Sequence, residues 1–203
     1  MSKPYSKDKS QIIREYIERF SRNDLLKKMF NQTEIEAELN SNINNVVSDP
    51  SIRASGQYTR SSKDISFVRE NIGAHTETHE ATHSIFKGLH DPKGAFGFVI
   101  SATDKGRGIN EGGTEYIANL LTTDELYGYK PVNETDINGI SLKTSSLSYP
   151  METNVFERLV AMYGDEMMID AMKNGPQELE KAMEKDRIIL CGYTWEFRYY
   201  MLE

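Results

Sequence analysis

The sequence predicts a mostly helical α+β domain with a small sheet in its N-terminal part and a helical C-terminal lobe. Apolar residues recur at helical spacing over most of the chain, and one segment has strand-like residues between Ser-Gly and Ser-Ser turn patterns. The 203 residues, 38% of them hydrophobic, fit one domain with two lobes. We therefore expect a single domain over 1–203, with N-terminal helices at 10–47, a core at about 54–122 and a C-terminal lobe at about 150–203.

The N-terminal helices follow from the spacing of apolar side chains. These side chains keep a helical period over residues 12–20 and again over 25–30, so we expect one helix or a kinked pair with a break at Asn23-Asp24. A Thr-x-x-Glu capping box at 33–36 predicts the start of the next helix, which should stop before Asp49-Pro50. Further along, Pro150 is placed to begin a helix that Gly164 ends.

The remaining elements follow from the spacing of apolar residues and from the Gly, Pro, Asn and Ser residues that separate helices and strands. In chain order we expect a hairpin or two short strands at 54–68, a helix at 71–89, a loop with one strand at 96–100, a helix at 110–122, a connection rich in Gly, Asn and Ser up to 149, and, after the helix at 150–164, helices through 183 and at 193–202.

The chemistry is expected on the helix at 71–89, which contains the sequence His79-Glu80-Ala81-Thr82-His83. Residues four apart share a helix face, so the two imidazoles can converge on one metal ion while Glu80 flanks it. Two histidines and a carboxylate suit zinc and leave one position for a water whose pKa falls to about 7. We expect one Zn²⁺ per chain, with Glu80 taking the water's proton and passing it to the leaving group.

The third ligand is expected in the string Asn110-Glu111-Gly112-Gly113-Thr114-Glu115, at the start of the next helix. The HExxH sequence followed by an Asn-Glu-x-x-Thr-acid helix resembles the gluzincin zinc peptidases, which include thermolysin-like enzymes. The resemblance covers residues 79–121 and implies a zincin-like fold and peptide-bond hydrolysis. It makes Glu111 the third zinc ligand and Glu115 the acid that orients a zinc-bound imidazole.

Such peptidases also need a donor for the oxyanion of the tetrahedral intermediate. We expect Tyr149, just before Pro150, to serve as this second catalytic residue; Tyr127, Tyr129 and Tyr163 are alternatives. Arg107 could bind a substrate carboxylate or instead be solvated.

Two further histidines and one strand have weaker claims to a role. His75 could approach the metal, line the cleft or be solvated. His90 could bind substrate or interact favourably with the dipole at the C-terminal end of the helix. The strand at 65–68 could offer an exposed edge for main-chain recognition of substrate or serve the core alone.

Composition limits the partners. With 24 Lys and Arg against 31 Asp and Glu, the net charge of −7 gives no electrostatic basis for broad binding to nucleic acid or an anionic membrane. The single cysteine, Cys191, cannot form an intramolecular disulfide, and the sequence has no signal peptide or membrane-spanning stretch. We expect a cytoplasmic enzyme acting on a peptide or protein, and we make no prediction of its oligomeric state.

The predicted function is therefore zinc-dependent peptide hydrolysis. Two alternatives stand beside a general peptidase: a regulatory protease specific for one intracellular protein, and a binding protein in which zinc only braces the fold. Glu80 argues against the last, because a purely structural site does not require it.

Overall fold

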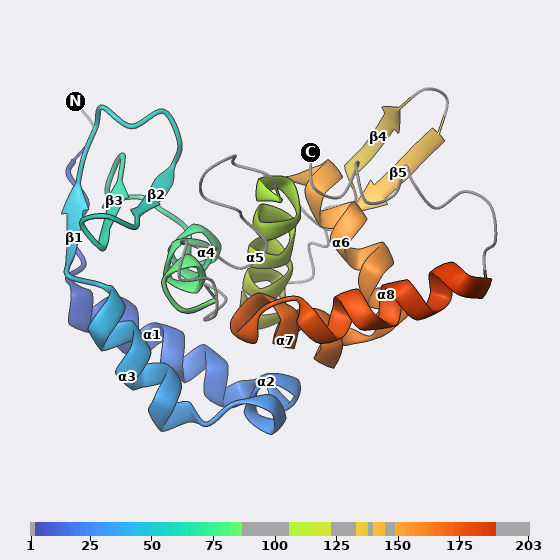
Figure 1. The fold of residues 1–203 in the computed structure, drawn as a ribbon. Coiled ribbons are helices and arrows are strands. Elements are labelled where there is room, and N and C mark those ends of the chain that lie inside the picture. The colour runs from blue at the N-terminus through green and yellow to red at the C-terminus, as the bar shows by residue number, and fades with distance from the viewer. Residues whose placement is uncertain (1–2, 87–105, 123–132, 138–139, 145–148, 190–203) are drawn as a thin grey trace. The chain divides into compact units, whose positions relative to one another are not determined.

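The computed structural model describes residues 3–86, 106–122, 133–137, 140–144 and 149–189 (Figure 1). These residues form eight helices and five strands, which confirms a mostly helical α+β chain. The chain divides into two compact units, one made of Met1–Ile85 with Ile117–Lys130 and the other of Phe86–Tyr116 with Pro131–Glu203. Each unit is described by itself below.

The first unit begins with two helices, α1 (Lys9–Arg22) and α2 (Asp24–Met29). Asp8 accepts a hydrogen bond from the backbone N–H of Gln11, whose side chain accepts one from the backbone N–H of Asp8, so a reciprocal capping box starts α1. The side chain of Asn23 caps α2, and its own backbone is extended. The expected break at Asn23-Asp24 is therefore confirmed, and its cause is a new N-cap.

Helix α3 (Gln32–Asn42) is shorter than predicted at its C-terminal end and starts differently. The cap is Asn31, whose side chain accepts from the backbone N–H of Thr33, so the predicted capping box at 33–36 was wrong. Residues beyond Asn42 form strand β1 (Asn45–Ser48) instead of continuing the helix to 47. Pairing with a neighbouring strand outweighs the helical spacing of the apolar residues there.

The sheet of this unit has the order β1-β3-β2. Strand β3 (Asp64–Phe67) runs parallel to β1 and antiparallel to β2 (Gly56–Thr59), which confirms the strands expected at 54–68. Because β3 is hydrogen-bonded on both sides, the alternative of an exposed edge at 65–68 was wrong, and the alternative of a strand that serves the core agrees with the buried Ile65 and Phe67. The edge strands are β1 and β2.

Helix α4 (Ala74–Ile85) follows the sheet and corresponds to the helix expected at 71–89. It packs against α1, α3 and β2. Around it, the core of this unit is formed by apolar side chains from helices and strands: Ile12, Ile13, Tyr16, Phe20, Leu26, Ile35, Leu39, Ile65, Phe67, Ala81, Ile85 and Ile117.

Helix α5 (Arg107–Thr122) begins three residues earlier than predicted. Its first part belongs to the second unit, together with the hairpin of β4 (Asn133–Ile137) and β5 (Ile140–Thr144). The hairpin was missed, because we predicted only a connection there. The Asn-Gly dipeptide at 138–139 is the sequence pattern that could have predicted it.

Three helices complete the second unit: α6 (Pro150–Tyr163), α7 (Asp165–Asn174) and α8 (Gln177–Ile189). The predicted start at Pro150 and end at Gly164 are confirmed. Gly164 and Gly175 have φ of 86° and 104°, a backbone conformation that favours glycine and separates the helices.

Several predicted features lie outside the described residues: His90, the strand at 96–100, Tyr127, Tyr129, Cys191 and the helix at 193–202. Within the described part of the chain, no helix has both the length and the apolar character needed to cross a membrane.

Two glycines let α5 approach its neighbours in the second unit. A Cβ atom built on Gly112 would lie 2.2 Å from the carbonyl oxygen of Glu152 in α6. One built on Gly113 would lie 2.2 Å from Sδ of Met172 in α7 and 2.6 Å from the ring of Phe156. Neither position has room for a side chain, so the glycines of this string are explained by close helix packing.

We predict that Gly112→Ala destabilises the protein by about 1–3 kcal/mol, although alanine is the better helix former. The reason is that the clash is with backbone, which cannot rotate away. Gly108→Ala is the matched control, since its Cβ would have only an ordinary contact of 3.6 Å with Glu152. This control should be neutral or up to about 1 kcal/mol more stable. Urea unfolding followed by circular dichroism measures both, and an unchanged midpoint for Gly112→Ala would contradict the packing described.

Candidate metal centre

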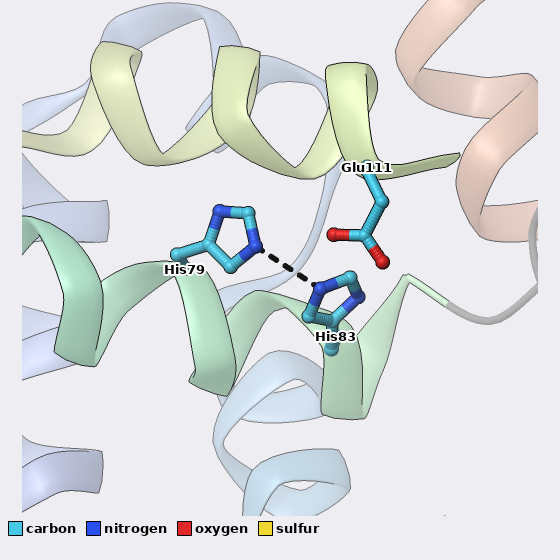
Figure 2. Close-up of side chains that lie close together, drawn as sticks. All are labelled: His79, His83 and Glu111. Carbon is cyan, nitrogen blue, oxygen red and sulfur yellow. Dashed lines mark hydrogen bonds between the residues drawn. The ribbon is translucent and has the colours of Figure 1, made fainter. Parts of the chain in front are cut away.

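Helix α4 presents His79 and His83 on one face (Figure 2). Their Nε2 atoms lie 3.1 Å apart, and the two rings are nearly perpendicular, at 81°. His79 is 5% exposed. The two histidines are one turn apart, which explains why their side chains meet. Helical spacing thus brings together the two nitrogens that the sequence predicted as ligands.

Glu111 of α5 completes a group of three possible ligands. One ligand atom from each of His79, His83 and Glu111 lies within 4.8 Å of the others. Figure 2 shows the carboxylate of Glu111 directed towards the imidazoles. Helix α5 is also tied to α4 further along, where Nδ1 of His75 lies 3.0 Å from Oγ1 of Thr122.

The two imidazoles fit a tetrahedral zinc ion closely. Zinc–nitrogen bonds of 2.0–2.1 Å at a tetrahedral angle place two nitrogens about 3.3 Å apart. The observed Nε2 separation is 3.1 Å, close to this value, and in the structure it is spanned by a hydrogen bond between the two rings.

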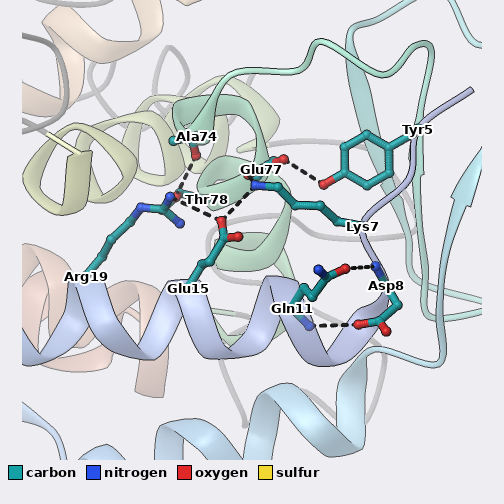
Figure 3. A network of polar contacts seen from close by, with 9 residues as sticks. All are labelled: Tyr5, Lys7, Asp8, Gln11, Glu15, Arg19, Ala74, Glu77 and Thr78. Atoms are coloured by element: carbon teal, nitrogen blue, oxygen red, sulfur yellow. Dashed lines mark hydrogen bonds and ion pairs between the residues drawn. The ribbon is translucent and has the colours of Figure 1, made fainter. Parts of the chain in front are cut away.

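The opposite face of α4 is held by buried polar contacts (Figure 3). Glu77, about 200° around the helix from His79, is 2% exposed. Its carboxylate accepts hydrogen bonds from Tyr5 Oη at 2.6 Å and Lys7 Nζ at 2.8 Å. Lys7 also pairs with Glu15 of α1 at 2.8 Å. We call Tyr5, Lys7, Glu15 and Glu77 the N-terminal clamp, because it fastens the start of the chain to the histidine helix.

The N-terminal clamp shifts two pKa values. Burial, and then the hydrogen bond to Glu77, raise the pKa of Tyr5 well above its ordinary value. Burial alone would lower the pKa of Lys7, but its bonds to Glu15 and Glu77 outweigh this effect and raise it. Sequence reasoning missed the clamp, because no local pattern relates Tyr5 or Lys7 to a helix 70 residues away.

The side chain of Glu80 is directed from α4 to strand β2 and not towards solvent. Its Oε2 accepts a hydrogen bond from the backbone N–H of Tyr58 in β2 at 2.8 Å, and the residue is 7% exposed. A carboxylate has about four acceptor sites, so the bond from Tyr58 alone does not fill them.

The other predicted residues have defined positions, and their roles remain predictions. Glu115 is 1% exposed and lies one turn after Glu111 on α5. Tyr149 is the N-cap residue of α6, Tyr163 is the last residue of that helix, and Arg107 is the first residue of α5. His75 is not among the three grouped ligands and instead contacts Thr122.

The chain matches no protein-family model, no curated protein and no solved structure in the three comparisons made.

We predict that Tyr5→Phe destabilises the protein by about 1.5–3 kcal/mol, since it removes a hydrogen bond to a buried carboxylate. Tyr58→Phe is the control, because Tyr58 Oη donates to a neutral acceptor, the carbonyl of Asn42, at 2.8 Å. That variant should lose only about 0.5–1.5 kcal/mol. Urea midpoints at neutral pH give the comparison, and a Tyr5→Phe midpoint equal to that of the wild type would contradict a stabilising clamp.

The same pair of proteins has an expected pH dependence. The pKa of Tyr5 is raised in the folded state. Its contribution to stability is therefore complete below about pH 10, the pKa of an unfolded tyrosine, and is lost as the pH rises towards the folded value. The stability of the wild type should fall more steeply above about pH 10 than that of Tyr5→Phe.

Proposed function

We propose that this chain is a zinc-dependent peptidase with a zincin-like fold, acting in the manner of the gluzincins that its motifs resemble. The observation that supports this most is the 3.1 Å separation of the His79 and His83 Nε2 atoms, with the Glu111 carboxylate in the same group. Metal-assisted hydrolysis requires ligands at a separation that suits zinc and a carboxylate beside them. Helix α4 offers both, because Glu80 directly follows His79.

In this proposal, His79, His83 and Glu111 hold the ion. Bound zinc would supply a Lewis acid for the scissile carbonyl and lower the pKa of a coordinated water to about 7. Glu80 accepts a proton at its carboxylate and donates it to the leaving amine. Glu115 orients an imidazole, and the phenol of Tyr149 donates to the developing oxyanion.

The substrate is a peptide or protein. The net charge of −7 favours segments rich in Lys and Arg over acidic ones. The single cysteine suits a reducing compartment, so we place the activity in the cytoplasm.

One observation favours a second function, a binding protein in which zinc only braces the fold. Glu80 already bonds to the backbone of β2, and such a contact would also be useful in a structural site. The two functions differ in what Glu80 does once zinc is bound.

Substitution of Glu80 and His79 separates the two functions. We expect Glu80→Gln to keep one zinc per chain and to lose about 10²–10⁴-fold in turnover, because the amide cannot act as a base. His79→Ala should lose the zinc itself. Elemental analysis and cleavage of a mixed peptide library, followed by mass spectrometry, measure the two effects.

Three results would count against the proposed function or one of its assignments. Zinc retained in both His79→Ala and His83→Ala would exclude these ligands. Zinc loss in Glu80→Gln would show that this residue is not a separate base. Stoichiometric zinc with no cleavage by the wild type would support the binding protein.

A further inference from the structure

Strand β2 places a main-chain donor against Glu80. Because β2 is an edge strand, alternate N–H groups point away from β3, and that of Tyr58 is directed to the Oε2 atom of Glu80 at 2.8 Å. A hydrogen bond from a backbone amide to a carboxylate is short, strong and directional. The hydrogen bond from β2 therefore holds the carboxylate of Glu80 in a defined direction.

Gly56, two residues earlier on β2, leaves the space that Glu80 occupies. A Cβ atom there would lie 2.8 Å from Cγ and 3.1 Å from Oε1 of Glu80, and 2.9 Å from the ring of Phe67. A side chain at position 56 would therefore have to displace the stem of Glu80 as well as the edge of the buried Phe67 ring. The φ of Gly56 lies outside the positive region, so the requirement for glycine is one of space.

We propose that β2 positions Glu80, with Gly56 and the N–H of Tyr58 as the positioning groups. This proposal rests on the proposed function, in which Glu80 is the base. Neither group touches substrate; both act through the carboxylate. Gly56 keeps the stem of Glu80 close to the strand, and the N–H of Tyr58 fixes the direction of its carboxylate.

The effect on the reaction follows from geometry. A base displaced by about 1 Å can cost on the order of 10²-fold in rate. Glu80 is not one of the proposed ligands His79, His83 and Glu111, so its displacement is expected to leave the metal in place. The expected signature is a lower kcat with unchanged KM and zinc content.

The first test compares Gly56→Ala with Gly73→Ala, using a quenched peptide that the wild-type zinc protein cleaves. Gly73 precedes α4, and a Cβ there would meet nothing within 4 Å. We expect kcat to fall about 10- to 100-fold in Gly56→Ala and to stay at the wild-type value in Gly73→Ala, with zinc bound in both. Equal kcat values for Gly56→Ala and the wild type would overturn the proposal.

A second pair of variants tests the proposal independently, so that the test does not depend on the folding of Gly56→Ala. Tyr58→Pro removes the N–H, which bonds to Glu80 and not to β3, so that proline breaks no hydrogen bond between the strands. Tyr58→Ala keeps the N–H and removes the same side chain. We expect Tyr58→Pro to have a kcat about 10-fold below that of Tyr58→Ala at equal KM. Equal kcat values in this pair would also overturn the proposal.

An NMR measurement tests the contact without any activity. In ¹⁵N-labelled zinc protein, the Tyr58 amide proton should move upfield in Glu80→Ala and in Gly56→Ala, and should stay in place in Gly73→Ala. An unmoved resonance in Glu80→Ala would overturn the positioning of Glu80 by β2 even if the wild type is a peptidase. A moved resonance without hydrolysis by the wild type would instead overturn the proposed function, and with it a role for β2 in catalysis.

Discussion

The burial of a polar helix is the constraint on which the rest of the first unit depends. Helix α4 contains two glutamates and a histidine that are less than a tenth exposed, so each needs a partner inside the protein. Glu77 is bonded to Tyr5 and Lys7, and Glu80 to the backbone of β2. The hydroxyls of Thr78 and Thr82 donate to carbonyls one turn earlier. The bonds of Glu77 and Glu80 to other elements fix the rotation of α4, and the spacing of four residues places both imidazoles on one face of it.

The two helices of the candidate site achieve close packing by different means. Helix α4 is surrounded by side chains that satisfy its polar groups, whereas α5 uses glycine to let other helices of its unit approach its backbone at Gly112 and Gly113. The string from Asn110 to Glu115 therefore combines two requirements. Its glutamates are the residues proposed to bind zinc and to orient an imidazole, and its glycines are needed for packing.

The parts that sequence predicted well depend on neighbours in the chain. The spacing of His79 and His83, the break at Asn23 and the helix start at Pro150 are all set within a few residues. The parts that it missed depend on distant partners. Strand β1 replaces the end of a predicted helix because β3 pairs with it, and β3 is central because β2 covers its other side. The roles of Tyr5 and Gly56 likewise follow from α4, which local patterns do not relate to them.

The central claim is that one metal ion is shared by His79 and His83, and zinc K-edge X-ray absorption of the zinc-loaded protein tests it most directly. We expect two imidazole nitrogens at about 2.0–2.1 Å and oxygen ligands at about 2.0–2.2 Å. The imidazole scattering should decrease in His83→Ala. A sulfur ligand at about 2.3 Å, or a spectrum without two imidazoles, would contradict the claim.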